Sequence, residues 1–185
     1  MSQSQFTIRR YRMDDVDNVY DAVIVPGVHV SNWMDKLTTD YSRETTEDWG
    51  KLSLAAWESG DAYEHVIIDK DTKAIVGACG FYRVNKIDFD CNLGYWVRES
   101  HLGQGAALEA VRQIRNFAFK ETGLVGLEIV VAQTNLASRL VAEKARPMVD
   151  GPQRAIIRMH GVSYDARMYA LINPEANRYR EDSDR

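Results

Sequence analysis

The chain has 185 residues, of which 45% are hydrophobic and 27% charged, and its formal net charge is −4 at pH 7. This length and composition favour one globular domain with a substantial core. They exclude a membrane helix, because no apolar run approaches the roughly 20 residues needed, and the lack of a dense basic run argues against nucleic acid as a partner. With only two cysteines and no secretory signal pattern, we expect a reduced, cytoplasmic protein.

The first part of the chain predicts a strand and then a helix. Phe6–Tyr11 alternates apolar and polar residues, which is typical of a strand. Asp14 or Asp15 is predicted to cap a helix that ends at Pro26–Gly27. Residues 28–44 show no clear period.

A second helix and three strands are predicted to follow. Thr45–Asp48 has the composition of an N-cap, and the helix after it ends at Gly60–Asp61. The predicted strands are 63–68, 74–82 and 89–97. Their short connections favour antiparallel pairing.

The second half alternates helices and strands. The predicted elements are a helix from Gly105 to about Gly123, a buried strand at 127–132, a short helix at 137–144 and strands at 153–158 and 164–172. The polar tail from Pro174 onward is expected to fray. Because no repeat or linker divides the chain, we predict a mixed α/β domain with one partly antiparallel sheet.

The segment 98–106 carries the strongest functional signal. A predicted strand runs into a loop with Gly103 and Gly105, and a strong helix begins directly afterwards. Backbone N–H groups at such a helix start favour an anion, above all a phosphate. The loop lacks the Gly-Lys-Ser/Thr of nucleotide triphosphatases, and Leu108 stands at the third glycine of a dinucleotide fingerprint. We therefore expect a different phosphorylated cofactor.

The same loop resembles the coenzyme A loop of the GNAT N-acetyltransferase superfamily. Ser100, Gly103 and Gly105 occupy the places of its Gln/Arg-x-x-Gly-x-Gly/Ala motif, with serine replacing the usual first residue. Further segments that resemble the family, in its order, are Ile75–Gly77, Leu93–Trp96, Asn135–Ser138, Val141–Lys144 and Arg158–Leu171. The last of these resembles the RimJ/RimL-type branch.

The resemblance implies a single α/β (α+β) domain over residues 6–173, between a flexible N-terminus (1–5) and a charged C-terminal tail (174–185). It implies a mixed, mostly antiparallel sheet of about seven strands flanked by helices, with a splay between strands four and five. Acetyl-CoA is implied as the cosubstrate in that gap, with no metal. The histidines and cysteines also lack metal-ligand spacing.

The implied cofactor contacts are mostly made by the backbone. Groups near strand four would pair with the pantetheine arm like an added strand, and N–H groups of the loop would hold the pyrophosphate. The implied residues are Trp96, Val97, Arg98, His101, Leu102, Gly103, Gln104, Gly105, Ala106, Asn135 and Arg139. Instead of contacting the cofactor, Tyr95 and Trp96 could simply pack in the core. Arg98 could likewise be a solvated residue of the turn.

Ser138 is the predicted proton donor to the departing sulfur. Many relatives use a tyrosine on this helix, at the place that Ala142 occupies here, whereas RimL-like members use the serine that Ser138 matches. The alternative is that Ser138 only caps its short helix.

The general base is less well marked. The glutamates that relatives use correspond to Asn92 and Ile157 here. Asp88 and Asp90 alternate with Asn92, so we expect them to share one strand face, with Asp90 as the base, directly or through water. The alternative is a solvated carboxylate at a hairpin end.

A site without a well-marked general base favours an acceptor amine that is easily deprotonated. The reference pKa is about 7.7–8.0 for an α-amine and about 10.4 for lysine. We therefore predict acetyl transfer to a primary amine, with a protein or peptide N-terminus favoured, as in the RimJ/RimL branch. Trp33 and Asn92 are expected to contact this substrate.

Two other functions stay open from the sequence. One is acetylation of a small-molecule amine, such as an amino acid, a polyamine or an antibiotic. The other is an acyl-CoA-binding regulatory module without turnover, suggested by the missing base and by Arg146–Pro147 in place of the family's Gly-Phe. The protein is expected to be a monomer or a homodimer.

Overall fold

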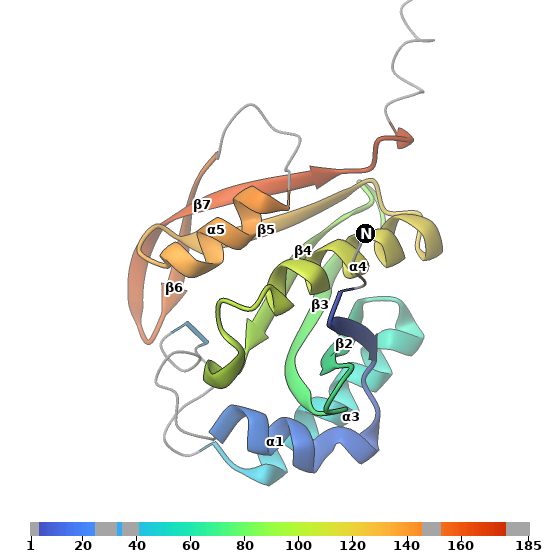
Figure 1. Cartoon of the computed structure of the whole chain (residues 1–185). Helices are drawn as coiled ribbons and strands as arrows, with labels where there is room; N and C mark the ends of the chain where they lie inside the picture. Colours follow the sequence, from blue (N-terminus) through green and yellow to red (C-terminus); the bar gives the residue numbers. More distant parts are fainter. Residues whose placement is uncertain (1–3, 25–32, 35–40, 146–152, 177–185) are drawn as a thin grey trace, which may run out of the picture.

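The computed structural model describes residues 4–24, 33–34, 41–145 and 153–176. Seven strands form one sheet in the order β1-β2-β3-β4-β5-β7-β6 (Figure 1). The strands are β1 Phe6–Arg10, β2 Ala62–Asp69, β3 Ile75–Asn85, β4 Asp90–Val97, β5 Gly126–Ala132, β6 Gln153–Met159 and β7 Val162–Ile172. Every neighbouring pair is antiparallel except β4–β5, which is parallel. The predicted seven-stranded, mostly antiparallel sheet is confirmed.

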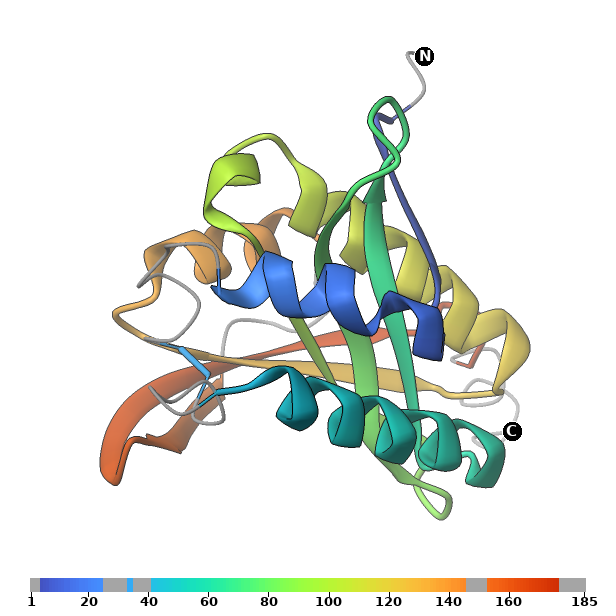
Figure 2. The same ribbon diagram turned by 90° about the horizontal axis from the view of Figure 1, so that it is seen from below.

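Helices cover both faces of this sheet. They are α1 Val16–Ile24, α3 Arg43–Ser59, α4 Ala106–Glu121 and α5 Leu136–Lys144, with short 3-10 turns η1 Met13–Asp15 and η2 Glu99–His101. The helices α1 and α3 lie on one side of the sheet, and α4 and α5 lie on the other (Figures 1 and 2). None of the described helices is both long and apolar enough to cross a membrane.

The larger core lies between the sheet and α4. Residues Ala110, Val111, Ile114 and Ala118 of α4 are spaced by one, three or four positions, and all are at most 1% exposed. This spacing gives the helix one continuous apolar stripe, which packs on Leu93 and its neighbours in the sheet. A smaller cluster on the other face joins α1 to β2 and contains Val16, Val19 and Val66.

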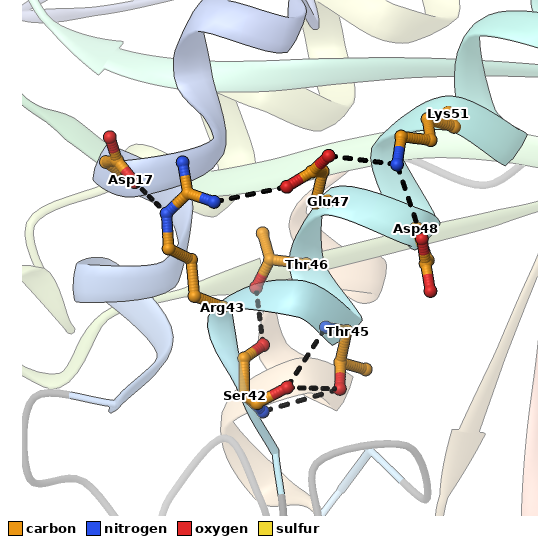
Figure 3. Close-up of polar contacts among 8 residues, drawn as sticks. All are labelled: Asp17, Ser42, Arg43, Thr45, Thr46, Glu47, Asp48 and Lys51. Carbon is orange, nitrogen blue, oxygen red and sulfur yellow. Dashed lines mark hydrogen bonds and ion pairs between the residues drawn. The ribbon is translucent and has the colours of Figure 1, made fainter.

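Helix α3 begins earlier than the sequence indicated. Ser42 is its N-cap, because the Ser42 hydroxyl accepts from the N–H of Thr45 at 3.2 Å, and the Thr45 hydroxyl accepts from the N–H of Ser42 at 3.4 Å (Figure 3). Thr45 is therefore the third helical residue of a capping box, and the expectation of a cap at Thr45–Asp48 was wrong. Arg43 then ties α3 to α1 through an ion pair with Asp17 (Figure 3).

The start of α1 also differs from the predicted cap. The Asp15 carboxylate turns back, accepting from the N–H of Arg12 at 2.9 Å and from the Arg9 guanidinium at 2.6 Å through both oxygens. Burial opposes ionisation of Asp15, but these hydrogen bonds outweigh it and hold the pKa of Asp15 below its usual range. Asp15 therefore joins β1 to the turn before α1.

The β3–β4 connection corrects one expectation about the site. Strand β3 extends to Asn85, and Phe89 has a positive φ of 57°, so β4 begins at Asp90. Asp88 lies in the turn, where its carboxylate accepts from Asn85 Nδ2 at 2.7 Å. Asp88 therefore does not share a strand face with Asp90.

Several sequence expectations fall outside the described residues. They concern residues 1–3, the helix end at Pro26–Gly27, most of the segment 28–44, Arg146–Pro147 and the tail beyond 176. Gln5, expected in a flexible end, is bonded to the β2–β3 turn: its carbonyl accepts from Lys70 N–H at 2.9 Å.

Candidate active site

The parallel strands β4 and β5 separate soon after they begin. Their pairing covers only Asp90–Asn92, opposite Gly126–Glu128. From Leu93 to Val97, β4 keeps its pairing with β3 but has no β5 partner, and the two ribbons diverge (Figure 1). We call this divergence beyond Asn92 the splay. It leaves one edge of β4 without a strand neighbour, which is where an extended ligand could add main-chain hydrogen bonds.

The glycine loop leads from β4 to the start of α4. Gly103 and Gly105 have φ of 73° and 89°, and Gly105 is the N-cap of α4. No atom lies within 4 Å of a Cβ built at either glycine, so the loop is bare on that side. The N–H groups of His101 and Leu102 donate within the turn, to the carbonyls of Arg98 and Glu99.

The amides left for a ligand are therefore those of residues 103–106, which we call the amide cradle. The first N–H groups of α4 add the positive end of the helix dipole. This chemistry fits the diphosphate of coenzyme A.

Internal hydrogen bonds brace the loop. Gln104 Nε2 donates to the Ser100 carbonyl at 2.9 Å, and the Ser100 hydroxyl lies 2.9 Å from His101 Nδ1. His101 Nε2 in turn lies 3.8 Å from the buried carboxylate of Asp69, at the end of β2. His101 thus lies beside the end of β2, and its ring also packs edge-on against Phe6 of β1.

Ser138 lies in the first turn of α5 but does not cap it. Asn135 is the N-cap, and its Oδ1 accepts from the N–H of Ser138 at 3.0 Å. The Ser138 hydroxyl instead lies 3.0 Å from the hydroxyl of Tyr95 on β4. Burial raises the pKa of Tyr95 to about 12, and the hydrogen bond with Ser138 offsets only part of that shift. The capping alternative for Ser138 therefore does not hold.

Arg139 follows Ser138 on α5. Its guanidinium donates to the Gln133 carbonyl at 3.3 Å and lies 3.6 Å from the Glu143 carboxylate. Its Nε is buried and has no hydrogen-bond partner among the described residues. Arg139 thus holds the end of β5 to α5, beside the predicted proton donor.

Asp90 and Ser138 lie on opposite sides of the sheet. Alternation along β4 places Asp90 and Asn92 on one face, and Cys91, Leu93 and Tyr95 on the face of α4 and α5. Asp90 sits at the closed end of the splay. An acid and a base at these two places would reach a reacting centre in the splay from opposite faces.

Sequence reasoning missed a second carboxylate near Asp90. Glu128 on β5 pairs with Asn92 across β4–β5. Burial, and then the charge of Asp90, raise the pKa of Glu128. The two carboxylates therefore share one region of the sheet face, although 38 positions of sequence separate them and no local pattern links them.

Sequence reasoning also missed a third carboxylate, on β2. Glu64, Gly80 and Gly94 pair in register across β2, β3 and β4. The Glu64 carboxylate lies over Gly80, because a Cβ at that glycine would overlap it, and the Tyr82 ring contacts the position over Gly94. Strand β2 thus places a carboxylate over β3, on the sheet face that Asn92 and Gly94 share.

Trp33, expected at the substrate, is half-buried, and its contact with a substrate stays a prediction. Cys79 and Cys91 are buried and free, and burial raises the pKa of both thiols, that of Cys91 to about 12. Within the described parts of the chain, no group of three or more His, Cys, Asp or Glu residues could hold a metal ion.

Comparison with known proteins agrees with this geometry. The family model described as acetyltransferase (GNAT) domain matches residues 5–146. The Probable N-acetyltransferase YjcK of Bacillus subtilis (strain 168) is 29% identical over 119 residues, which are 64% of this chain and 66% of that protein. The Putative ribosomal N-acetyltransferase YdaF of the same organism is 24% identical over 176 residues, 91% of this chain and 92% of that protein.

Solved structures share the fold. RimL, a ribosomal L7/L12 alpha-N-protein acetyltransferase in complex with coenzyme A, has a TM-score of 0.82 at 20% identity, over 92% of this chain and 95% of that one. Ribosomal-protein-S5-alanine acetyltransferase from Vibrio fischeri has a TM-score of 0.83 at 16% identity, over 95% and 97%. Because the GNAT domain model spans most of the sequence, this chain belongs to the GNAT acetyltransferase family.

Proposed function

We propose that this GNAT acetyltransferase transfers the acetyl group of acetyl-CoA to a protein or peptide N-terminal α-amine, by direct attack of the amine while both substrates are bound. The observation that carries the proposal is the splay beside the amide cradle of residues 103–106. An unpaired strand edge and a cluster of backbone N–H groups suit an amide-containing arm and a diphosphate. The backbone near Trp96, Val97 and Arg98 would receive the arm.

Binding both substrates together supplies much of the rate. Holding an amine and a thioester in a reactive geometry is worth about 7–11 kcal/mol at best. Asn135 and Arg139, at the start of α5, would hold the cofactor near Ser138. In this proposal Trp33 and Asn92 contact the acceptor on the face of α1 and α3.

Ser138 donates a proton to the departing sulfur, and Asp90 accepts a proton from the amine, directly or through water. The opposite faces of these residues suit the two ends of one transfer. A general acid or base of this kind typically raises the rate of the chemical step by about 10²–10⁴-fold. Neither of the glutamate positions usual in the family carries a glutamate here, because they hold Asn92 and Ile157.

The absence of the family's usual glutamate bases is the reason to favour an α-amine as acceptor. From the reference pKa values, the neutral fraction of an α-amine at pH 7 exceeds that of lysine by roughly 10²–10³-fold. The names of YdaF and of the RimL and Vibrio fischeri structures describe acetyltransferases of ribosomal proteins or of their N-termini. They support a protein N-terminus as acceptor, at identities too low to carry the substrate over.

The test compares two peptides of one sequence that contains an internal lysine. One has a free N-terminus and a dimethylated lysine, and the other has an acetylated N-terminus and a free lysine. Release of free coenzyme A at pH 7 is expected with the first peptide, with kcat/KM at least tenfold higher than with the second. Preference for lysine, or turnover with polyamines or amino acids only, would contradict the proposed acceptor and leave acetyl transfer standing.

A further inference from the structure

Tyr95 makes two contacts with one residue on the far side of the splay. Its hydroxyl lies 3.0 Å from the carbonyl oxygen of Ser138 and 3.0 Å from the hydroxyl oxygen of Ser138. A tyrosine hydroxyl has one proton to donate, and a carbonyl can only accept. Tyr95 can therefore donate to the carbonyl while it accepts from the Ser138 hydroxyl, or it can donate to the Ser138 hydroxyl oxygen.

The two arrangements point the Ser138 proton differently. In the first, the Ser138 proton is directed at Tyr95. In the second, the Ser138 oxygen accepts from Tyr95, and its own proton is free for a third atom. A rotation of two hydroxyl groups converts one arrangement into the other, with no movement of heavy atoms.

The surrounding structure holds both residues in place. The Tyr95 ring packs, partly buried, against the core under α4, on a strand that stays paired with β3 through Cys79. Ser138 is held by its backbone N–H, which donates to Asn135 Oδ1. Beyond Asn92, β4 and β5 do not pair. The contact between Tyr95 and Ser138 therefore links β4 to α5 across the splay.

From this geometry we infer that Tyr95 is a positioning residue for Ser138: its hydroxyl aims the Ser138 proton and hydrogen-bonds to the Ser138 oxygen while that oxygen gives its proton away. The inference rests on the proposed function, in which Ser138 donates to the departing sulfur. Tyr95 acts through Ser138 and does not itself contact the reacting atoms.

The proton balance leaves both residues unchanged after a cycle. The carbon–nitrogen bond forms as the carbon–sulfur bond breaks, and the electron pair of that bond stays on sulfur. Sulfur takes the Ser138 proton, and Asp90 takes the proton that the attacking nitrogen loses. After the transfer, Asp90 releases that proton to solvent and Ser138 regains one from solvent, so the protons balance. Tyr95 keeps its own proton throughout, because burial raises its pKa to about 12.

The test is a double-mutant cycle with Tyr95→Phe, Ser138→Ala and the double variant, measured as kcat and as KM for acetyl-CoA. Tyr95→Phe removes one oxygen and keeps the ring. We expect kcat to fall about 10- to 100-fold, which corresponds to roughly 1.4–2.8 kcal/mol, with KM for acetyl-CoA unchanged. In the Ser138→Ala background, Tyr95→Phe should have no further effect on kcat.

A matched control is Tyr169→Phe. The hydroxyl of this buried tyrosine on β7 also reaches α5, where it donates to Glu143 at 3.1 Å. Among the described residues it makes no hydrogen bond to Ser138, so kcat should stay within twofold of the wild type. A loss of kcat equal to that of Tyr95→Phe would mean that any lost hydroxyl under α5 slows the enzyme, and would overturn the inference.

The remaining outcomes separate this inference from the proposed function. If Tyr95→Phe keeps full kcat while Ser138→Ala is slow, or if the two losses multiply in the double variant, only the role of Tyr95 fails. If Ser138→Ala keeps full kcat, the donor role of Ser138 fails and this inference fails with it. If the wild type releases no coenzyme A with any amine, both fail.

Discussion

The imidazole of His101 faces the carboxylate of Asp69, with 3.8 Å between Nε2 and the nearer oxygen. His101 belongs to the turn that leads into the amide cradle, and Asp69 ends β2. The same carboxylate accepts from the N–H of Asp71 at 2.8 Å and from Gln5 Nε2 at 3.0 Å. One buried acid thus accepts hydrogen bonds from the β2–β3 turn and from Gln5, and lies beside the loop that leads to the amide cradle.

Loss of the Asp69 carboxylate should loosen the loop at residues 98–106. Asp69→Ala is expected to lower the melting temperature and to weaken acetyl-CoA binding several-fold in calorimetric titration, because both the turn and the partner of His101 are lost. Asp69→Asn keeps an acceptor for the turn, so its melting temperature and its affinity for acetyl-CoA should fall less. Asp71→Asn, on the exposed part of the same turn, is the control, and an affinity loss there equal to that of Asp69→Ala would contradict the assignment.

The amide cradle can be blocked without disturbing the core. Gly105→Trp should abolish acetyl-CoA binding, because its side chain would fill the bare side of the loop while no atom lies within 4 Å of the added Cβ. The positive φ of 89° should cost about 1–2 kcal/mol of stability. Acetyl-CoA at 100 times Kd stabilises the wild type by about 2.7 kcal/mol, roughly 5–10 °C in melting temperature, and the variant should show no shift.

Gly123→Trp is the matched variant at the other end of α4. Gly123 has a positive φ of 72° and also has open space around its Cβ position. It should lose similar stability and keep the full thermal shift with acetyl-CoA. Wild-type affinity in Gly105→Trp would refute the placement of the diphosphate.

Asp90 can be tested as the base against its neighbours. Asp90→Asn is expected to lower kcat by up to about 10²–10⁴-fold. Its residual rate should rise with pH up to about 8, following deprotonation of the α-amine itself. Initial rates between pH 6 and 9 check this.

Asp88→Asn is the control for that experiment, since Asp88 lies in the turn and pairs with Asn85. Its rate should match the wild type. If Glu128→Gln or Glu64→Gln lowers kcat by about 10²–10⁴-fold and Asp90→Asn does not, the base is one of the carboxylates that only the structure brought to this face.

Acid should destabilise the protein through His65. This buried ring lies 5.0 Å from the rings of both Trp57 and Phe117, and burial lowers the pKa of His65 to about 4 from an ordinary value of 6.5. Between these values the unfolded chain binds more protons than the folded one, so stability falls as pH drops from about 6.5 to 4. The loss is at most about 3 kcal/mol.

Urea unfolding at several pH values measures this effect. His65→Gln should be less stable at pH 7.5, and its stability should depend less steeply on pH between 6.5 and 4. An equally steep dependence in the variant would show that other groups cause the acid lability.

Much of the fold follows from local sequence patterns. Apolar spacing in α4, alternation in β1 and the glycines around residue 105 each act within a few residues, so their structures were predicted to within a few positions. The start of α3 was misplaced because Ser42 and Thr45 both have the chemistry of a cap, and hydrogen-bond geometry alone distinguishes them. The break before Asp90 was missed because it depends on the backbone conformation of Phe89.

By itself, the sequence determined the order of the elements through side-chain periodicity, and the place of the glycine loop through residues close together in the chain. The family followed from the ordered set of motifs that resemble it, and the family model matches residues 5–146. Tertiary structure alone decided that Tyr95 meets Ser138, that Glu128 lies near Asp90 and that Glu64 lies over Gly80. These neighbours are 16 to 43 positions apart, and strand register and the separation of β4 from β5 bring them together. Register and separation depend on how the whole sheet packs against its helices, which no local segment encodes.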